Sequence, residues 1–262
     1  MISFDLDFFP RDDARGDDLD DFENLLESWL ASLLRNGNII NGWQNLELGD
    51  RVQVRAVAVA PDALEKRNWD TSAERDWAKL EPLFLTPPHF ARVGGLPKEP
   101  TWCECAAPSG RVLFTTFLDE GSPVGCLDCG QDVPLYRLPH LRVGGDHNDF
   151  RGWQADFQAL DQLWMGSSVG ERFAYRQLAR PKSDFMKETR ELAARLESTS
   201  GVPTYSFLLH HHKKWGKRCP LCARKWTWKH SPRALLAFKC DHCRLVSSEA
   251  SDEKTPLREL HP

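Results

Sequence analysis

Apolar residues occupy every second position at the start of the chain, from Ile2 to Phe8. This period of two predicts a strand with one buried face. The period then lengthens, because leucine, phenylalanine and tryptophan recur at helical spacing from Leu19 to Leu34. The pattern predicts an amphipathic helix that ends before Gly37.

A second strand is predicted over residues 51–60, where apolar and polar residues alternate again before Pro61. Thr71 and Glu74 have the spacing of a capping box and predict the start of a short helix. Pro87 and Pro88 open a stretch that is predicted to be rich in loops.

Aromatic and aliphatic residues return to helical spacing between residues 150 and 198. The pattern predicts three helices, of which the second ends at Pro181 and the third at Gly201. Stripes of this kind are more typical of a packed core than of a cofactor site. Short strands are predicted on either side of this segment, over residues 111–117 and 205–209.

Cysteines near the end of the chain have a strong metal-binding pattern. Cys219 and Cys222 are followed, after 17 residues, by Cys240 and Cys243. Two pairs with this spacing can direct four sulfur atoms to one ion, so these cysteines are predicted to hold a structural zinc ion in a zinc ribbon. A redox pair is the alternative interpretation, and two matched pairs disfavour it. Ala223 follows Cys222 at a position where the turn often requires positive φ.

A second set of cysteines lies earlier in the chain. Cys126 and Cys129 have the same spacing and are followed by Gly130, whereas Cys103 and Cys105 are separated by one residue. The sequence predicts a second structural zinc ion bound by these four cysteines. Two alternatives stay open: two buried free thiols beside a two-ligand knuckle, or a single site that mixes cysteines of both sets.

These elements together predict the α+β class. An N-terminal α/β sandwich of the ferredoxin-like kind is followed by a zinc-knuckle β insert, a helical segment and a C-terminal zinc ribbon. The predicted boundaries are 1–95 for the α+β domain, 96–145 for the first zinc-binding module, 146–209 for the helical segment, 210–250 for the basic ribbon and 251–262 for a tail.

Charge is distributed unevenly along the chain. Residues 1–30 hold ten acidic and two basic residues, and residues 210–244 hold ten basic residues against Asp241. Lysine and arginine suit phosphate contacts and tryptophan suits base stacking, so RNA or single-stranded DNA is the expected partner. The residues predicted to make these contacts are Lys213, Lys214, Trp215, Lys217, Arg218, Arg224, Lys225, Trp226, Trp228 and Lys229.

Part of this basic segment has a second interpretation. A divalent ion on four thiolates carries a net negative charge, which nearby lysine and arginine side chains would neutralise. Trp226 and Trp228 flank Thr227 and share one face of a strand. They therefore form either a stacking platform or the small core of the ribbon.

A protein partner is the second hypothesis for function. The acidic residues between positions 5 and 27 could mimic nucleic acid towards a basic partner. This would suit an adaptor, or an immunity protein that binds and neutralises a toxin.

An enzymatic role is the third hypothesis and the least favoured. The sequence has no phosphate-binding glycine loop and no nucleophile-elbow motif, so no catalytic residue is assigned and the chain is expected not to be an enzyme. His210 and His212 would share one face of a strand and could share an ion, but with His211 they are more typical of an extended basic surface.

Several segments resemble a known bacterial family. They are Phe114–Leu118, Ser122–Cys129, Val133–Pro139, Thr199–Tyr205 and Phe238–Ser247. The family is of unknown function and is described as containing a zinc ribbon, with nucleic acid suggested as its ligand. The resemblance covers about residues 100–250. It implies metal-binding roles for the matching cysteines and names no catalytic residue.

Membrane association is not expected. No apolar run approaches the ~18 residues of a membrane-spanning helix. The first residues have neither the basic region nor the apolar segment of a secretory signal. A cytoplasmic location is therefore expected, and the clustered cysteine pairs are expected to bind metal rather than to form disulfides.

Overall fold

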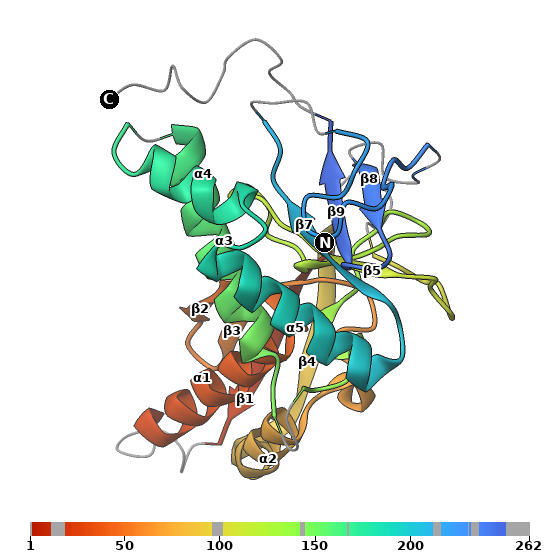
Figure 1. Ribbon diagram of the computed structural model, residues 1–262. Coiled ribbons are helices and arrows are strands. Elements are labelled where there is room, and N and C mark those ends of the chain that lie inside the picture. Colours follow the sequence, from red (N-terminus) through yellow and green to blue (C-terminus); the bar gives the residue numbers. More distant parts are fainter. Residues whose placement is uncertain are drawn as a thin grey trace. The chain divides into compact units, whose positions relative to one another are not determined.

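The computed structural model describes residues 2–11, 19–95, 102–141, 145–166, 168–211, 216–229, 231 and 236–249. The chain divides into two compact units, and each has its own sheet (Figure 1). The N-terminal unit consists of Met1–Trp102, Glu120–Ser122 and Pro134–Asn148. The C-terminal unit consists of Cys103–Asp119, Pro123–Val133 and Asp149–Pro262.

The sheet of the N-terminal unit is antiparallel and has the strand order β2-β3-β1-β4. Its strands are β1 (Ile2–Pro10), β2 (Ile39–Glu47), β3 (Val52–Ala58) and β4 (Phe84–Gly95). Helix α1 (Leu19–Asn36) connects β1 to β2, and helix α2 (Thr71–Leu80) lies between β3 and β4. The short 3-10 helices of this unit are η2 (Lys66–Asn68), η3 (Glu81–Leu83) and η4 (Leu135–Arg137). This βαββαβ order is that of ferredoxin-like domains.

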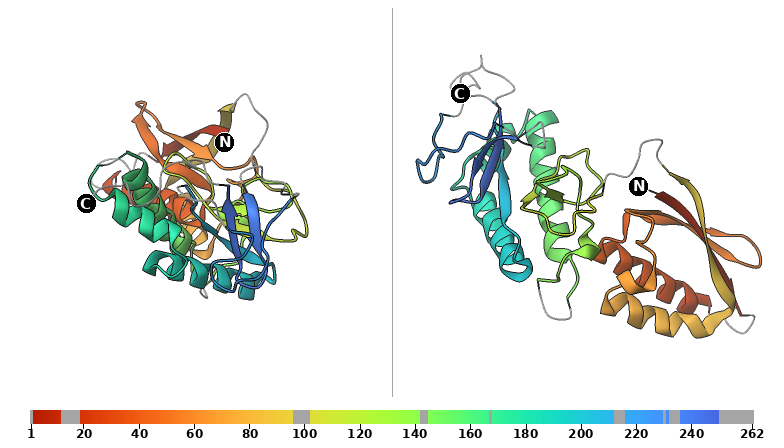
Figure 2. Two further views of the ribbon diagram at one scale, coloured as in Figure 1. Left: turned by 45° about the horizontal axis from the view of Figure 1, so that its top comes forward. Right: turned by 90° about the vertical axis from the view of Figure 1, so that its right-hand side faces the viewer.

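Helices α1 and α2 cover one face of this sheet, as the right-hand view of Figure 2 shows. Trp29 of α1 and Trp77 of α2 contact each other with ring centroids 4.9 Å apart. Leu6 of β1 and Val54 of β3 are paired in the sheet and belong to the same buried cluster. The alternating pattern of the first strand is therefore explained by a core on one side of the sheet.

Two strands and one helix start of the N-terminal unit differ from the sequence prediction. Strand β2 is not predicted, and β4 includes Pro87 and Pro88, which were expected in a loop. Proline is tolerated there because β4 lies at the edge of the sheet and its pairing with β1 shifts register nearby. Asp70 rather than Thr71 caps α2, since its Oδ1 accepts a hydrogen bond of 2.7 Å from the backbone N–H of Ala73.

The sheet of the C-terminal unit has the strand order β6-β5-β7-β9-β8. Its strands are β5 (Arg111–Leu113), β6 (Val124–Cys126), β7 (Thr204–Leu208), β8 (Leu236–Cys240) and β9 (Leu245–Ser248). The three central strands are parallel, and the two edge strands run antiparallel to their neighbours. The predicted strand at 111–117 is shorter in the structure, because β5 ends at Leu113.

The helices of this unit are α3 (Asn148–Gly166), α4 (Glu171–Ala179) and α5 (Asp184–Ser200). Ser183 caps α5, and Gly201 ends it with a φ of 70°. The indole N–H of Trp153 in α3 donates a hydrogen bond of 2.9 Å to the Thr189 hydroxyl of α5. Trp153, Phe157 and Trp164 of α3 are buried, as expected for a core stripe, whereas Phe173 of α4 is exposed.

None of the helices in the described part of the chain combines the length and the apolar character that crossing a bilayer requires.

The two edge strands of the C-terminal sheet are relevant to the cysteines. Strand β6 ends at Cys126 and strand β8 ends at Cys240. One sheet therefore carries a cysteine pair at each of its two edges.

Candidate metal centres

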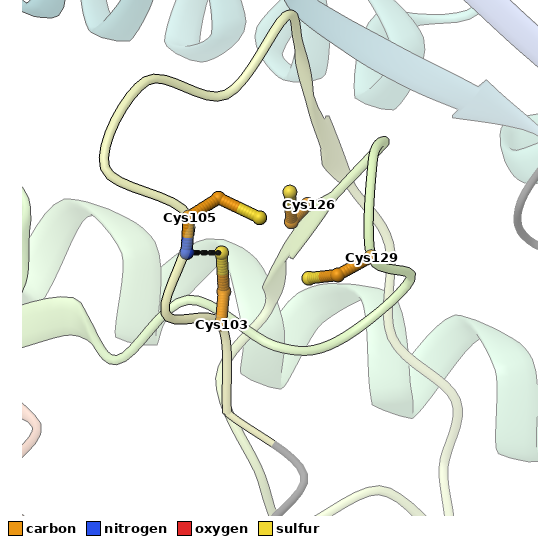
Figure 3. A group of neighbouring side chains, drawn as sticks. All are labelled: Cys103, Cys105, Cys126 and Cys129. Atoms are coloured by element: carbon orange, nitrogen blue, oxygen red, sulfur yellow. Dashed lines mark hydrogen bonds between the residues drawn. The ribbon is translucent and has the colours of Figure 1, made fainter.

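Cys103, Cys105, Cys126 and Cys129 form the first cysteine group. Their four sulfur atoms lie within 4.8 Å of one another, and Figure 3 shows them pointing toward a common centre. Cys126 and Cys129 come from the end of β6 and the turn after it, and the other two come from the segment before β5. The backbone N–H of Cys103 donates a hydrogen bond of 2.6 Å to the carbonyl of Asp132, which joins the two segments.

Cys219, Cys222, Cys240 and Cys243 form the second cysteine group, and their sulfur atoms also lie within 4.8 Å of one another. The Sγ atoms of Cys222 and Cys240 are 3.6 Å apart. All eight cysteines lie in described residues and none forms a disulfide. The four sulfur atoms of each set lie together, so the alternative of a single site that mixes cysteines of both sets is wrong.

Three of the four cysteine pairs share one turn geometry. The backbone N–H of Cys126 donates to the carbonyl of Gln131, and that of Cys219 donates to the carbonyl of Arg224. Cys240 is paired with Leu245 at the same sequence distance. The residue after each second cysteine has positive φ, with values of 75° at Gly130, 59° at Ala223 and 51° at Arg244. The positive φ suspected at Ala223 from the sequence is therefore present.

The remaining pair reaches the same arrangement with one residue fewer. The backbone N–H of Cys105 donates to the Sγ of Cys103 at 3.4 Å, as the dashed line in Figure 3 shows. In the opposite knuckle the N–H of Asp128 donates to the Sγ of Cys126, also at 3.4 Å. Hydrogen bonds of this kind hold the sulfur atoms in place and stabilise their charged form.

Burial and crowding make it unfavourable for all of these thiols to ionise together. Burial raises the pKa of Cys103 and of Cys243 well above the usual range, and it raises the pKa of Cys240 to about 11. By contrast, a hydrogen bond from the backbone N–H of Arg224 lowers the pKa of Cys222 to about 7. A bound divalent cation would compensate the charge of four thiolates in each group.

The donor sets fit a metal ion. Four sulfur atoms placed tetrahedrally at the usual Zn–S length of about 2.3 Å lie about 3.8 Å from one another. The sulfur separations in both groups are compatible with this value. Each group could therefore hold a metal ion, and four protein ligands would leave no coordination position open to a substrate.

Trp226 does not form a stacking surface. It is 1% exposed and belongs to a buried cluster with Cys219, Cys240 and Leu208. This corrects its prediction as a nucleic-acid contact: a ring without exposed surface cannot receive a base. Trp228 lies nearer the surface and is half-buried, and the Nζ of Lys239 lies 5.3 Å from the centre of its ring.

Five of the basic residues predicted to bind nucleic acid are exposed in the structure. They are Lys217, Arg218, Arg224, Lys225 and Lys229. Lys217, Arg218, Arg224 and Lys225 flank the first knuckle of the second cysteine group, where residues 218 and 225 form an antiparallel bridge, and Lys229 follows a few residues later. Within the described residues, none of the five forms an ion pair with a carboxylate. Lys213, Lys214 and Trp215 lie outside the described residues.

The histidines are placed differently from the predicted surface. His210 is buried, and its Nδ1 lies 3.2 Å from the carbonyl oxygen of Ser248. The ring of His211 packs against Trp164 with centroids 4.7 Å apart. His212, which would share a metal with His210, lies outside the described residues.

The acidic segment between residues 5 and 27 is partly described. Asp5 forms an ion pair of 2.7 Å with Arg55, and Glu27 accepts hydrogen bonds from two side chains of β2. Residues 12–18 lie outside the described part of the chain. The Asp5 and Glu27 side chains thus have partners within their own unit.

Two residues beside the cysteine groups are not among the site residues predicted from the sequence. Arg111 is buried next to the first group, and Lys239 lies between the rings of Tyr205 and Trp228. The only sequence signal for Arg111 is a charged residue at the start of an apolar strand. That signal does not distinguish a buried arginine from one at a strand end.

Two family models match parts of this chain. Residues 105–209 match a domain of unknown function, DUF2310, and residues 211–253 match another, DUF8594. The boundary between the matched segments falls between the two cysteine groups, so the first model includes three cysteines of the first group and the second model includes the whole second group.

Two relatives come from Haemophilus influenzae, and both are described as uncharacterized proteins. One is 33% identical over 154 residues, which cover 55% of this chain and 73% of the relative. The chain belongs to the same family as this protein. The other relative is 29% identical over 238 residues, covering 86% of this chain and 89% of its own length. The family has no assigned function, in agreement with the resemblance seen in the sequence.

Solved structures with partial similarity include that of Rv0793 from Mycobacterium tuberculosis. The sequences are 17% identical, the match covers 37% of this chain and 96% of Rv0793, and the TM-score is 0.30. A candidate antibiotic biosynthesis monooxygenase from Nitrosomonas europaea is 10% identical to this chain. The match covers 37% of this chain and 99% of the monooxygenase, with a TM-score of 0.31. Another, from Chloroflexus aurantiacus, has 17% identity, 36% and 95% coverage and a TM-score of 0.27. Because two of these structures are described as monooxygenases, the expectation that the chain is not an enzyme is not retained. TM-scores this low assign no reaction to the chain.

Proposed function

We propose that this chain binds two structural zinc ions and contacts RNA or single-stranded DNA through the basic surface of its second cysteine group. The observation that carries the proposal is a set of exposed basic side chains at the first knuckle of that group and in the segment after it, none of which has a carboxylate partner among the described residues. The set consists of Lys217, Arg218, Arg224, Lys225 and Lys229.

Zinc is the metal best suited to both groups. Four thiolates in a closed tetrahedral shell favour zinc over magnesium, calcium or manganese, which take oxygen ligands. Iron is the other metal that such a shell accepts. We assign zinc a structural role because four protein ligands exclude a bound water, and because metal binding of this kind supplies folding free energy.

The number of exposed charges supports a polyanionic partner. A zinc ion on four thiolates has a formal charge of −2, which some neighbouring cations must balance. Lys239 and Arg244 lie beside the same group but are already engaged with Asp241 and Glu197, at 3.1 and 2.7 Å. The five exposed cations exceed the formal charge of the site, and such a surface favours phosphate groups.

Base stacking would contribute less to binding than a platform of both Trp226 and Trp228 would. With Trp226 in the core, Trp228 is the described tryptophan of this surface that keeps exposed area. Its ring is already in contact with Lys239. We therefore propose that binding is dominated by phosphate contacts and shows little preference for sequence.

The first test is a metal count on the purified full chain by elemental analysis. Two zinc ions per chain are expected. A count of one or fewer, or a predominance of iron, would contradict the zinc assignment without involving nucleic acid.

The second test measures binding of the full chain to a mixed-sequence single strand of RNA and of DNA across a salt series. Binding is expected to weaken linearly on a logarithmic scale as salt rises. Replacing Lys217 and Lys225 by alanine should weaken binding to all sequences and reduce the slope by about 1.4, at ~0.7 per phosphate contact for a single strand. The matched control replaces Lys66 and Lys79, two exposed lysines of the N-terminal unit, and should leave binding unchanged. Absence of binding at low salt would reject the nucleic-acid proposal and favour a protein partner.

A further inference from the structure

Arg111 lies directly opposite a ligand of the first cysteine group. It is the first residue of β5, and its backbone is in register with Cys126 at the end of β6. Residues that face each other across an antiparallel pair place their side chains on the same side, with Cβ atoms about 4.5–5.5 Å apart. The arginine side chain therefore starts on the side of the sheet that carries Cys126.

Two of the three guanidinium nitrogen atoms of Arg111 are buried without a hydrogen-bond partner among the described residues. The residue is 9% exposed, and its Nε and Nη1 atoms have no acceptor among the described residues. Arginine retains its positive charge in proteins, so burial in this state is unfavourable unless negative charge lies close by.

The negative charge near Arg111 comes from cysteines rather than carboxylates. Arg111 is in register with Cys126, and the Cys126 thiol becomes a negatively charged thiolate when the group binds a metal ion. Within the described residues, no aspartate or glutamate forms an ion pair with it. A metal-loaded first group, with four thiolates around a divalent ion, would supply the missing negative charge.

We propose that Arg111 is a positioning residue of the first metal centre, where its buried guanidinium balances part of the net negative charge of the metal–thiolate cluster. The inference rests on the proposed zinc occupancy of that group and is independent of nucleic-acid binding. It adds a residue that neither the cysteine pattern nor the family description singles out.

The second cysteine group is built differently. Two cations beside it, Lys239 and Arg244, have carboxylate partners, and the basic residues of its first knuckle are exposed to solvent. Solvent screens the exposed charges, whereas the buried charge of Arg111 acts at low dielectric. We therefore expect metal retention to depend on an arginine in the first group and not in the second.

The test compares zinc retention in the full chain with Arg111→Met, Arg111→Lys and, as matched control, Arg224→Met. Arg224 is also next to a cysteine group but is exposed. Zinc-loaded protein is challenged with a chromogenic chelator at fixed pH, and the zinc released per chain is recorded. In Arg111→Met, the zinc affinity of the first cysteine group should be about 10–100-fold lower than in the parent chain, so one of the two ions should be released more readily. Arg111→Lys should restore most of the loss, and Arg224→Met should behave like the parent.

Equal zinc retention in the parent chain and in Arg111→Met would overturn the inference. Equal zinc loss in Arg111→Met and Arg111→Lys would also overturn it, because the shape of the side chain and not its charge would then matter. If Arg111→Met does not fold, Arg111→Gln replaces it. If neither neutral variant folds in the presence of zinc but Arg111→Lys does, the inference is supported. If none of the three variants folds, the inference is rejected. A parent chain without zinc in the first group would instead reject the zinc proposal.

Discussion

The rings of Trp226 and Phe238 lie 5.0 Å apart, centre to centre, with an angle of 31° between their planes. The indole N–H of Trp226 donates a hydrogen bond of 3.0 Å to the carbonyl of Gly216. Both rings belong to the buried cluster that includes Met186 of α5 and Cys240. The second cysteine group is thus attached to the C-terminal unit through an aromatic core.

Replacing Trp226 by alanine should destabilise the C-terminal unit by about 3–5 kcal/mol, the usual cost of removing a large buried aromatic side chain. Chemical denaturation followed by circular dichroism measures this effect. Trp228→Ala is the matched comparison and should cost less, because the Trp228 ring is half-buried. Equal costs for the two variants would contradict the assignment of Trp226 to the core.

Replacing Ala223 by glycine should stabilise the second cysteine group. Ala223 has a φ of 59°, a left-handed conformation that glycine adopts without steric cost. After allowing for the greater flexibility of glycine in the unfolded chain, the expected gain is about 0.5–1 kcal/mol. The comparison variant is Ala223→Val, which should destabilise because β-branched residues disfavour positive φ. Thermal unfolding of the zinc-loaded chain measures both, and a loss of stability in Ala223→Gly would count against the turn geometry.

Acid should weaken the N-terminal unit through Asp62. Its Oδ1 accepts hydrogen bonds of 2.7 Å from the Tyr136 hydroxyl and 2.8 Å from Arg137. Although burial raises the pKa of Asp62, these hydrogen bonds outweigh it and the net pKa is lowered from 3.8. Since the unfolded state binds the proton more readily, this stabilisation is present above about pH 4 and is lost as pH falls through the folded pKa.

The variant Asp62→Asn tests this linkage. At pH 7 it should be less stable than the parent chain by about 1–3 kcal/mol, the usual range for hydrogen bonds to a charged group. The difference should shrink as pH falls below about 4, because the parent carboxylate then becomes neutral as well. Urea denaturation at a series of pH values measures it. A difference that is constant across the series would show that the charge of Asp62 has no role.

Metal removal should affect the two units differently. Structural zinc supplies folding free energy, so a strong chelator should open the C-terminal unit around both cysteine groups. Strands β6 and β8 end at the metal ligands Cys126 and Cys240, so their backbone amides should lose protection from hydrogen exchange. Amides of β1 and α1 should keep theirs, because both cysteine groups lie in the C-terminal unit. Equal loss of protection in all four elements would indicate that the units do not fold independently.

The chain sequence alone is sufficient to predict features that depend on neighbouring residues. The cysteine pairs of the second group were recognisable because one turn of a few residues sets the direction of both sulfur atoms. The helices over residues 19–36 and 184–200 were recognisable because apolar residues recur with the helical period and glycine follows each end. The positive φ at Ala223 also follows from its place in a knuckle.

Only the tertiary structure decided which distant segments come together. Strand β5 pairs with β7, and β7 with β9, over long sequence separations. Every residue except proline offers the same backbone hydrogen-bonding groups, so pairing between remote strands has no local signal. For the same reason, the sequence could not show that β4 accepts Pro87 and Pro88 at a sheet edge.

The fates of Trp226, Trp228 and Arg111 also depended on tertiary contacts. The two tryptophans have the same spacing and neighbours of similar character, yet only Trp226 packs against α5 and β7 through Met186 and Leu208. Arg111 begins a strand whose sequence is compatible with an exposed or a buried start. Burial is a property of the surfaces that close over a side chain, and those surfaces come from elements far away in the chain.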